Sequence, residues 1–206
     1  MKRRILGLYA ITNDEADTAR LCNAASDALE GGASVLQYRN KTATEELRDL
    51  QAHALAALCA RHDVEFIVND QLELALQIEG AGLHVGAKDS DDLGAIRHAL
   101  GADRRLGVSC YASLERARAA VAAGADYVAF GSVFASPTKP AAARAPLALF
   151  AKARKLGVPL VGIGGITLEN LPLLIDAGAD AAAVITELFG ASDVCERARA
   201  LARCFD

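Results

Sequence analysis

One segment of the chain joins a strand-like pattern to a loop that could bind an anion. Residues 127–140 read YVAFGSVFASPTKP, in which apolar residues alternate with small ones before a polar stretch begins. That stretch consists of Ser136, Pro137, Thr138, Lys139 and Pro140. Two hydroxyls and one ammonium stand between prolines whose φ angles are fixed, so a phosphate-sized anion would meet donors in set positions.

Cations follow a second apolar segment, at residues 34–39. Gln37, Arg39 and Lys41 alternate along the chain, which places them on one face of an extended strand. If that face looks into a barrel, it delivers an amide and two cations to the barrel mouth. The alternative is a solvated strand end with ordinary surface charges, and this stretch alone favours neither.

Two carboxylates stand at the ends of consecutive apolar segments. Asp70 ends the segment 65–70, and Asp89 follows the segment 82–86. Side chains so placed could share Mg²⁺, which keeps several waters and often takes its other ligands from substrate phosphates. The alternative is that each caps the helix that follows it, near Leu72 and Asp91. The cations one strand away favour the metal site.

A hydroxyl and a thiol end the segment 105–110. No adjacent histidine or other base would activate Ser109 or Cys110 as a nucleophile, so Ser109 is predicted to donate a hydrogen bond to an anion and Cys110 to be inert. His84 is predicted to be a hydrogen-bonded core residue without a catalytic role. We therefore expect no serine–histidine hydrolase.

Consecutive glycines suggest a second anion site. Gly164 and Gly165 end the apolar segment 159–165, where free backbone N–H groups and a helix N-terminus could bind a phosphate beside Ile185 and Thr186. The alternative is a bare tight turn. A diphosphate-sized site at Arg39, Lys41, Ser109 and Lys139 and a monophosphate site in the same mouth would suit a transferase that joins two phosphorylated ligands.

The elements that must position these residues alternate regularly between strand-like and helix-like segments. The predicted strands are 5–12, 34–39, 65–70, 82–86, 105–110, 127–133, 159–165 and 181–187, and the predicted helices include 45–61, 114–123 and 147–156. Eight such units can close into an α/β single-domain (β/α)₈ barrel over residues 1–206, with active residues at the carboxyl ends of the strands. Glycine-rich triplets before the even-numbered strands support the barrel, because each glycine would end a helix and turn the chain. A doubly wound sheet also alternates strands and helices, and the count and regularity of the units favour the barrel over it.

Composition narrows the class of protein. The 206 residues carry a net charge of −4 and 5% aromatics, so the chain has no basic surface of the kind that binds nucleic acid.

Five scattered cysteines without a CxxC pair favour a reducing cytoplasm. Charges interrupt every apolar run before it could span a membrane. The short apolar run after Lys2, Arg3 and Arg4 is read as the first strand, with no signal peptide. Ala-rich outer helices could hide a homo-oligomer interface.

Seven short strings follow one another along nearly the whole chain: LYAIT at 8–12, LQYRNK at 36–41, FIVND at 66–70, GLHVGAKD at 82–89, GVS at 107–109, SPTKP at 136–140 and GIGGI at 162–166. In this order they resemble the thiamine phosphate synthase family. The resemblance implies an enzyme that joins hydroxymethylpyrimidine diphosphate to hydroxyethylthiazole phosphate, or to its carboxylated form with loss of CO₂. Diphosphate leaves in a dissociative step through a carbocation, and the product is thiamine phosphate.

The resemblance also implies roles for particular residues. Those implied to hold the pyrimidine diphosphate are Gln37, Arg39, Lys41, Asn69, Ser109 and Lys139, and those implied to hold the thiazole phosphate are Ser136, Thr138, Gly165, Ile185 and Thr186. Asp70 and Asp89 are implied to bind Mg²⁺. Tyr38, Asn40 and Pro137 lie within the matching strings and are counted as substrate-binding positions. Arg39, Lys41, Ser109 and Lys139 are the expected catalytic residues.

The sequence departs from the family pattern at four positions. Asn40 stands where many members carry an acid, and Gln71 where an arginine often follows the Asn-Asp pair. Both change the charge near the diphosphate and bear on affinity rather than on reaction type. Ser136 and Thr186 replace frequent threonine and serine and keep the hydroxyl. The rival interpretations are a thiazole tautomerase and a non-catalytic sensor of phosphorylated metabolites, and the retained 37–41 string, both aspartates and Lys139 argue against them.

Overall fold

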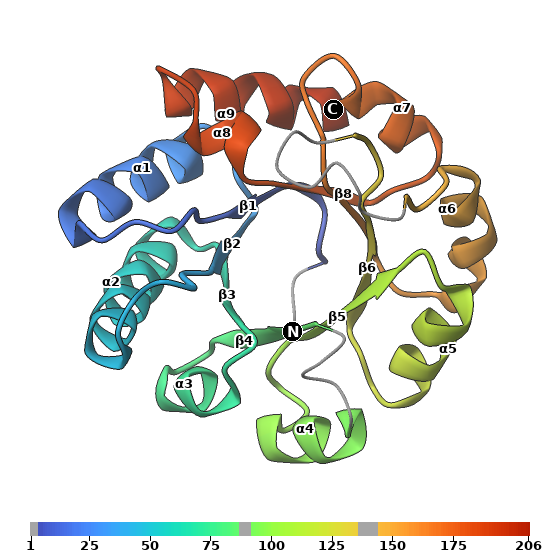
Figure 1. The fold of residues 1–206 in the computed structure, drawn as a ribbon, viewed down its shortest axis with the longest axis horizontal. Helices are drawn as coiled ribbons and strands as arrows, with labels where there is room; N and C mark the ends of the chain where they lie inside the picture. The colour runs from blue at the N-terminus through green and yellow to red at the C-terminus, as the bar shows by residue number, and fades with distance from the viewer. Residues whose placement is uncertain (1–3, 87–91, 136–143) are drawn as a thin grey trace.

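Eight parallel strands close into a barrel in the order in which they occur along the chain (Figure 1). The computed structural model describes residues 4–86, 92–135 and 144–206. The strands are β1 Gly7–Ile11, β2 Val35–Tyr38, β3 Glu65–Asn69, β4 Gly82–Val85, β5 Leu106–Tyr111, β6 Tyr127–Gly131, β7 Leu160–Ile163 and β8 Ala181–Val184. The sheet closes where β1 pairs with β8, with Gly7 opposite Ala181. This confirms the predicted (β/α)₈ barrel over the doubly wound sheet.

Helices surround the barrel and connect successive strands (Figure 1). They are α1 Thr18–Glu30, α2 Glu45–His62, α3 Leu72–Gln77, α4 Leu93–Leu100, α5 Leu114–Ala122, α6 Ala148–Ala153, α7 Leu171–Asp176, α8 Thr186–Phe189 and α9 Val194–Ala202, with 3₁₀ turns η1 Arg154–Leu156 and η2 Arg203–Phe205. The predicted helix 147–156 is thus divided between α6 and η1. No helix in the described part of the chain is long and apolar enough to cross a bilayer.

Alternation along the strands produces two separate apolar clusters. Tyr9, Ile67 and Val161 belong to the cluster inside the barrel, whereas Leu8 and Val68, one position away, pack between the sheet and the helices. Because successive side chains on a strand point to opposite faces, this register also decides which polar residues reach the barrel interior. The helix-facing cluster is rich in alanine, which lets short helices pack close to the strands.

The repeated Gly-Ala-Asp triplets have a structural role at the amino ends of two strands. Gly124 and Gly178 adopt positive φ angles of 91° and 99°, which end the preceding helices. The aspartates that follow each accept a backbone N–H from the preceding neighbour strand: Asp126 from Leu106 at 2.7 Å and Asp180 from Leu160 at 2.8 Å. The repeat therefore ties each new strand to the strand beside it.

Three predicted strands extend two or more residues too far at their carboxyl ends, and one of them, predicted to reach Gly165, ends at Ile163. The strand predicted to reach residue 187 ends at Val184, and Thr186 begins α8. The strand predicted to reach Val133 ends at Gly131. In these last two strands an apolar sequence continues past the last ladder position, so composition cannot mark where pairing stops.

Gly107 provides a test of how tightly the barrel interior is packed. A Cβ atom added there would lie 2.0 Å from Cζ of Tyr127, a fully buried side chain. We predict that Gly107→Ala lowers the free energy of unfolding by about 1–3 kcal/mol, because the tyrosine has no free space to move into. Urea denaturation measures the loss.

The matched control is Gly94→Ala in α4. A Cβ atom there comes no closer than 3.4 Å to its nearest neighbour, Oδ1 of Asp92. Alanine also favours a helix over glycine, so this variant should be neutral or more stable by up to about 1 kcal/mol. Equal stability changes for the two variants would contradict the packing argument.

Candidate functional site

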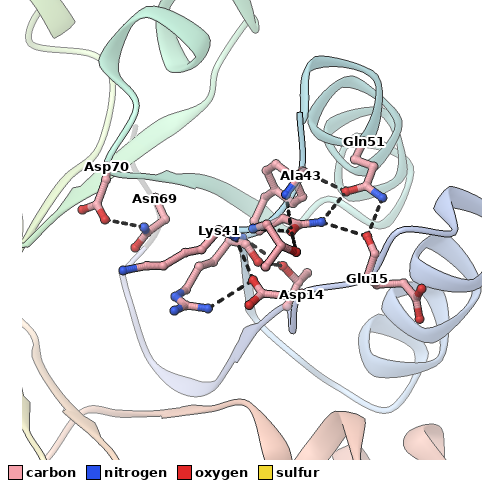
Figure 2. A network of polar contacts seen from close by, with 12 residues as sticks. Asp14, Glu15, Lys41, Ala43, Gln51, Asn69 and Asp70 are labelled. Atoms are coloured by element: carbon pink, nitrogen blue, oxygen red, sulfur yellow. Dashed lines mark hydrogen bonds and ion pairs between the residues drawn. The ribbon is translucent and has the colours of Figure 1, made fainter. Parts of the chain in front are cut away.

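A cleft opens at the carboxyl ends of β2 and β3. Its volume is about 240 Å³, and its lining residues are Tyr38, Arg39, Asn40, Lys41, Arg48, Val68, Asn69, Asp70 and Gln71. Most of the residues predicted from the 37–41 and 66–70 strings therefore lie in one place. Figure 2 shows the Lys41 side chain extending toward the side of the site that Asn69 and Asp70 occupy. The cleft combines one ammonium, two guanidinium groups, several side-chain amides and a carboxylate.

The chain beyond β1 fixes the exit of β2. The Thr12 hydroxyl accepts the Arg39 backbone N–H at 2.9 Å and donates to the Arg39 carbonyl at 3.0 Å. Oδ1 of Asp14 accepts the Lys41 backbone N–H at 2.8 Å and lies 3.5 Å from Nη1 of Arg39. These contacts hold two cations at the mouth, and within residues 4–86, 92–135 and 144–206 the one counter-charge beside Arg39 is Asp14. Sequence reasoning did not single out Thr12 or Asp14, although both follow a strand end at the same edge.

A buried amide network supports the loop after β2 (Figure 2). The Asn40 Nδ2 group donates to the Glu15 carbonyl at 2.8 Å and to Oε1 of Gln51 at 3.0 Å, while its Oδ1 accepts the Ala43 backbone N–H at 3.1 Å. Tyr38 faces the helix layer, and its hydroxyl donates to the same Gln51 oxygen at 2.8 Å. Tyr38 and Asn40 line the cleft, but their polar side-chain groups bond to protein partners and set the loop conformation.

Asp70 is held in an unusual backbone conformation at the exit of β3. Its φ angle is 61°, a left-handed value that is uncommon outside glycine and often marks a functional site. Oδ1 accepts the Gly86 backbone N–H at 3.0 Å, and Oδ2 accepts from the Asn69 side chain at 2.6 Å. The capping alternative for Asp70 is wrong, since Gln71 occupies the N-cap position of α3.

The described hydrogen bonds of the Asp70 carboxylate leave it able to bind a metal ion. Each of its oxygens accepts one hydrogen bond and retains a further lone pair, and Mg²⁺ needs only one or two carboxylates when phosphates supply other ligands. Among the described residues no three His, Cys, Asp or Glu side chains form a metal-binding group. Asp89, the second predicted ligand, lies outside the described residues.

A chain of hydrogen bonds crosses the barrel interior. Nε2 of Gln37 donates to the Tyr9 hydroxyl at 2.8 Å, and that hydroxyl lies 2.7 Å from the hydroxyl of Tyr127. The Tyr127 hydroxyl lies 2.9 Å from Nδ1 of His84, whose Nε2 lies 2.9 Å from Oγ of Ser109. Gln37 and Ser109, both predicted substrate ligands, are thus the two ends of one network.

This network corrects one prediction about Ser109. We expected no histidine beside it, but His84 on β4 contacts it directly because His84 pairs in register with Gly107 on the neighbouring strand. His84 is a hydrogen-bonded core residue, as predicted, and burial lowers its pKa from 6.5 to about 4. The imidazole is therefore neutral near pH 7, and Nδ1 faces a tyrosine rather than the carboxylate that orients the histidine of a hydrolase triad.

The exits of β7 and β8 lie side by side at the opposite part of the mouth. Ile163 on β7 pairs with Ala183 on β8, and two residues later the chain reaches Gly165 and Ile185. Gly165 has a φ angle of 68°, and a Cβ atom there would lie 2.4 Å from the Ala135 carbonyl oxygen. Gly165 therefore lets the loop pack against residues 134–135.

The short helix α8 begins at Thr186, next to this glycine turn. The first N–H groups of a helix lack intrahelical partners, and in (β/α)₈ barrels the loops after the seventh and eighth strands often bind phosphate with such a helix. Because β8 ends at Val184, sooner than predicted, the N-terminus of α8 lies at the predicted phosphate site. Ser136, Pro137, Thr138 and Lys139 lie outside the described residues.

Sequence reasoning missed polar residues that come from helices and from strand interiors. Arg48 on α2 donates to the Ala43 carbonyl at 2.8 Å and to the side chain of Gln71, whose oxygen, in the amide orientation that satisfies both groups, accepts at 2.8 Å. A guanidinium therefore stands beside Gln71. The signal for Arg48 and Gln51 was weak, because polar residues on an otherwise alanine-rich helix look like its solvated face.

Comparison with known proteins gives a consistent family. A family model described as thiamine monophosphate synthase matches residues 8–188. A thiamine-phosphate synthase of Methylobacillus flagellatus is 52% identical over 202 residues, covering 98% of this chain and 96% of the relative. A thiamine-phosphate synthase of Chromobacterium violaceum is 53% identical over 205 residues, covering 100% of this chain and 99% of the relative.

Solved structures agree at the level of the whole barrel. The chain is similar to a thiamine phosphate pyrophosphorylase from Pyrococcus furiosus, with a TM-score of 0.85, 31% identity and coverage of 97% of this chain and 95% of that chain. A 3-hexulose-6-phosphate synthase matches with a TM-score of 0.73 at 19% identity, covering 98% of this chain and 100% of that one. This second likeness concerns the fold alone.

The Asn40 network predicts the effect of a charge at that position. In Asn40→Asp the new carboxylate oxygen would face the Glu15 carbonyl and Oε1 of Gln51, both acceptors. We expect a loss of about 1–3 kcal/mol in the free energy of unfolding at pH 7, because the amide donor disappears from a buried site. The loss should shrink at acidic pH, where the protonated acid can donate. Asn23→Asp on the exposed face of α1 is the control and should change stability by less than about 0.5 kcal/mol.

The buried His84 predicts a pH dependence of stability. Because its folded-state pKa of about 4 lies below the value of 6.5 for an exposed histidine, the unfolded chain binds more protons between those pH values. Stability conferred by neutral His84 is complete above pH 6.5 and falls by about 3 kcal/mol as the pH drops toward 4. Urea denaturation across this range should show a shallower loss for His84→Gln than for the wild type. His98→Gln, at an exposed position, should keep the wild-type slope, and a wild-type slope in His84→Gln would contradict the assignment.

Proposed function

The chain belongs to the thiamine monophosphate synthase family, and we propose that its barrel mouth joins hydroxymethylpyrimidine diphosphate to a hydroxyethylthiazole phosphate, free or carboxylated. The enzyme is accordingly a thiamine-phosphate synthase, a transferase. The observation that carries the assignment of residues is the cleft at the exits of β2 and β3, which gathers the cations Arg39, Lys41 and Arg48 and one carboxylate. The products are thiamine phosphate and diphosphate, with CO₂ from the carboxylated thiazole.

The diphosphate is proposed to lie against Arg39 and Lys41. Asp14 steadies both residues from the β1 side, through the Lys41 backbone and the Arg39 guanidinium, and leaves the Lys41 ammonium directed toward Asn69 and Asp70 (Figure 2). Cations fixed before the reaction stabilise charge that develops on a departing diphosphate without having to reorganise. Lys139 is proposed to add a further cation. Gln37, Asn69 and Ser109 are proposed to orient the pyrimidine diphosphate, and Tyr38 and Asn40 to shape the cleft.

A divalent cation, Mg²⁺, is proposed to be held by Asp70 and Asp89. The support is the carboxylate of Asp70, which is fixed at the mouth by Asn69 and Gly86 and keeps lone pairs free for a ligand. When bound there, the ion would neutralise charge on the phosphate oxygens. The chain's own contribution is to hold this carboxylate beside the two cations.

The thiazole phosphate is proposed to bind at the exits of β7 and β8. Gly165, Ile185 and Thr186 stand where a glycine turn meets the start of α8, and Ser136, Pro137 and Thr138 would complete the site. Binding the thiazole by its phosphate positions its ring nitrogen near the pyrimidine carbon, which supplies much of the catalysis when the reaction needs little proton transfer.

The proposed chemistry needs charge stabilisation rather than a base. The bond between the pyrimidinylmethyl carbon and the diphosphate oxygen breaks, and the electron pair leaves with the diphosphate. The lone pair of the thiazole nitrogen then forms the new C–N bond to the cationic carbon, so the ring acquires the positive charge. His84 fits this scheme, because burial lowers its pKa to about 4 and so makes the imidazole a weak base. Its ring nitrogens lie within hydrogen-bond distance of Tyr127 and Ser109.

The cysteines support a proposal for the cellular setting. All five are unpaired and lie within the described residues, with Cys59 and Cys110 buried. Burial raises the pKa of both thiols to about 12, which keeps them protonated and unreactive. We propose a cytoplasmic enzyme. A homo-oligomer through the outer helices stays a prediction, to be checked by light scattering.

The test of the function is formation of thiamine phosphate from both substrates, followed by chromatography. We expect coupling to need Mg²⁺ and to stop with EDTA. Asp70→Asn should lower kcat/KM by about 100-fold or more at fixed Mg²⁺, because a fixed charge at the leaving group is lost. Asp103→Asn, in an exposed loop between α4 and β5 at the other end of the barrel, is the matched control and should keep wild-type activity. Wild-type turnover by Asp70→Asn would overturn the metal assignment.

A further inference from the structure

In the hydrogen-bond chain inside the barrel, counting the available protons decides which group donates and which accepts at each step. Gln37, at one end, uses Nε2 to donate to the Tyr9 hydroxyl. That hydroxyl has one proton, and among the described residues the only acceptor within hydrogen-bond distance of it is the hydroxyl of Tyr127. Tyr9 therefore donates to Tyr127. The Gln37 amide therefore sets the direction of the hydrogen bond between the two tyrosines.

Counting protons in the same way also assigns the donor and acceptor at each ring nitrogen of His84. The Tyr127 hydroxyl, already accepting from Tyr9, has its own proton free for Nδ1 of His84 at 2.9 Å. A neutral imidazole that accepts at Nδ1 carries its single proton on Nε2. That proton points at Oγ of Ser109, 2.9 Å away. Ser109 thus accepts from His84 and keeps its own hydroxyl proton available.

The opposite direction would give Ser109 the opposite character. If the Gln37 amide turned over, its oxygen would accept from Tyr9, and each later hydrogen bond would reverse. His84 would then carry its proton on Nδ1, and the Ser109 hydroxyl would donate inward to Nε2. Its oxygen would present only lone pairs to a ligand, which an anion would repel. The two directions therefore differ in whether Ser109 can bind an anion at all.

We propose that Tyr127 and His84 are positioning residues that hold Ser109 as a hydrogen-bond donor to the anionic substrate. This rests on the proposed function, in which that substrate is the pyrimidine diphosphate. Burial makes the arrangement strict, because Tyr9 and Tyr127 are 1% and 0% exposed and His84 is 7% exposed. Buried hydroxyls and ring nitrogens must pair with one another, so the state of one group dictates the next.

The tautomer of His84 tests the direction in the free enzyme. ¹⁵N NMR of the imidazole distinguishes a protonated nitrogen from an unprotonated one, and His84→Gln assigns the signals by their loss. We expect Nε2 protonated and Nδ1 unprotonated across pH 6–8. The exposed His98 serves as the internal reference for the imidazole signals. A dominant Nδ1–H tautomer, or an equal mixture of the two, would overturn the proposal.

A mutant cycle tests whether Tyr127 acts through Ser109. Tyr127→Phe removes the donor to Nδ1, so the Nε2–H preference should weaken and kcat/KM for the pyrimidine diphosphate should fall by about tenfold. Adding Tyr127→Phe to Ser109→Ala should lower kcat/KM by less than about twofold more, since the group it positions is already gone. Losses that multiply would overturn the positioning role. Tyr111→Phe removes a hydroxyl from an exposed tyrosine at the rim and should leave kcat/KM within about twofold of the wild type.

The tautomer test depends neither on the folding of Tyr127→Phe nor on the proposed function. The tautomer is measured on the wild-type protein without substrate, so the result stands even if Tyr127→Phe does not fold. Tyr9→Phe offers a second variant, which removes the donor to Tyr127 and should also weaken the Nε2–H preference. A protein with the expected tautomer but no thiamine phosphate formation would contradict the proposed function alone, whereas turnover with the wrong tautomer would contradict this inference alone.

Discussion

Closure of the sheet creates an interior in which polar groups must find partners among themselves. The buried side chains that cross it, from Gln37 through two tyrosines and His84 to Ser109, do so in one unbroken chain. An unpaired polar group there would cost about 1–3 kcal/mol, so every member constrains the next. The interior network therefore fixes the hydrogen-bonding character of its two ends, Gln37 and Ser109, which are proposed to orient the pyrimidine diphosphate.

The rim is built differently, by short contacts between successive strand exits. Thr12 and Asp14 beyond β1 hold the backbone after β2, and Asn69 and Gly86 hold the carboxylate of Asp70. Each exit is thus supported by contacts from a neighbouring exit as well as by contacts within its own loop. A small barrel with short loops can in this way place cations and a carboxylate around one cleft.

Much of this arrangement could be predicted from single strands. The alternation of Gln37, Arg39 and Lys41 indicated one face, and Asp70 stood where an apolar run ends. Contacts between strands could not be predicted, because they depend on the stagger of the closed sheet. The pairing that brings His84 beside Ser109 is such a case, and Tyr127 looked like an ordinary core residue. Gln51 was hidden for another reason, since a buried polar residue on a helix has the pattern of a solvated one.

The most direct test of the account is calorimetric titration of inorganic diphosphate, which measures the leaving-group site without requiring turnover. We predict one site in the presence of Mg²⁺, with affinity that falls by about tenfold or more in Arg39→Gln, because a charge-assisted contact is lost. The same change at the exposed Arg118 on α5 should have no effect. Equal affinity in wild type and Arg39→Gln would contradict the claim that the exit of β2 binds the diphosphate.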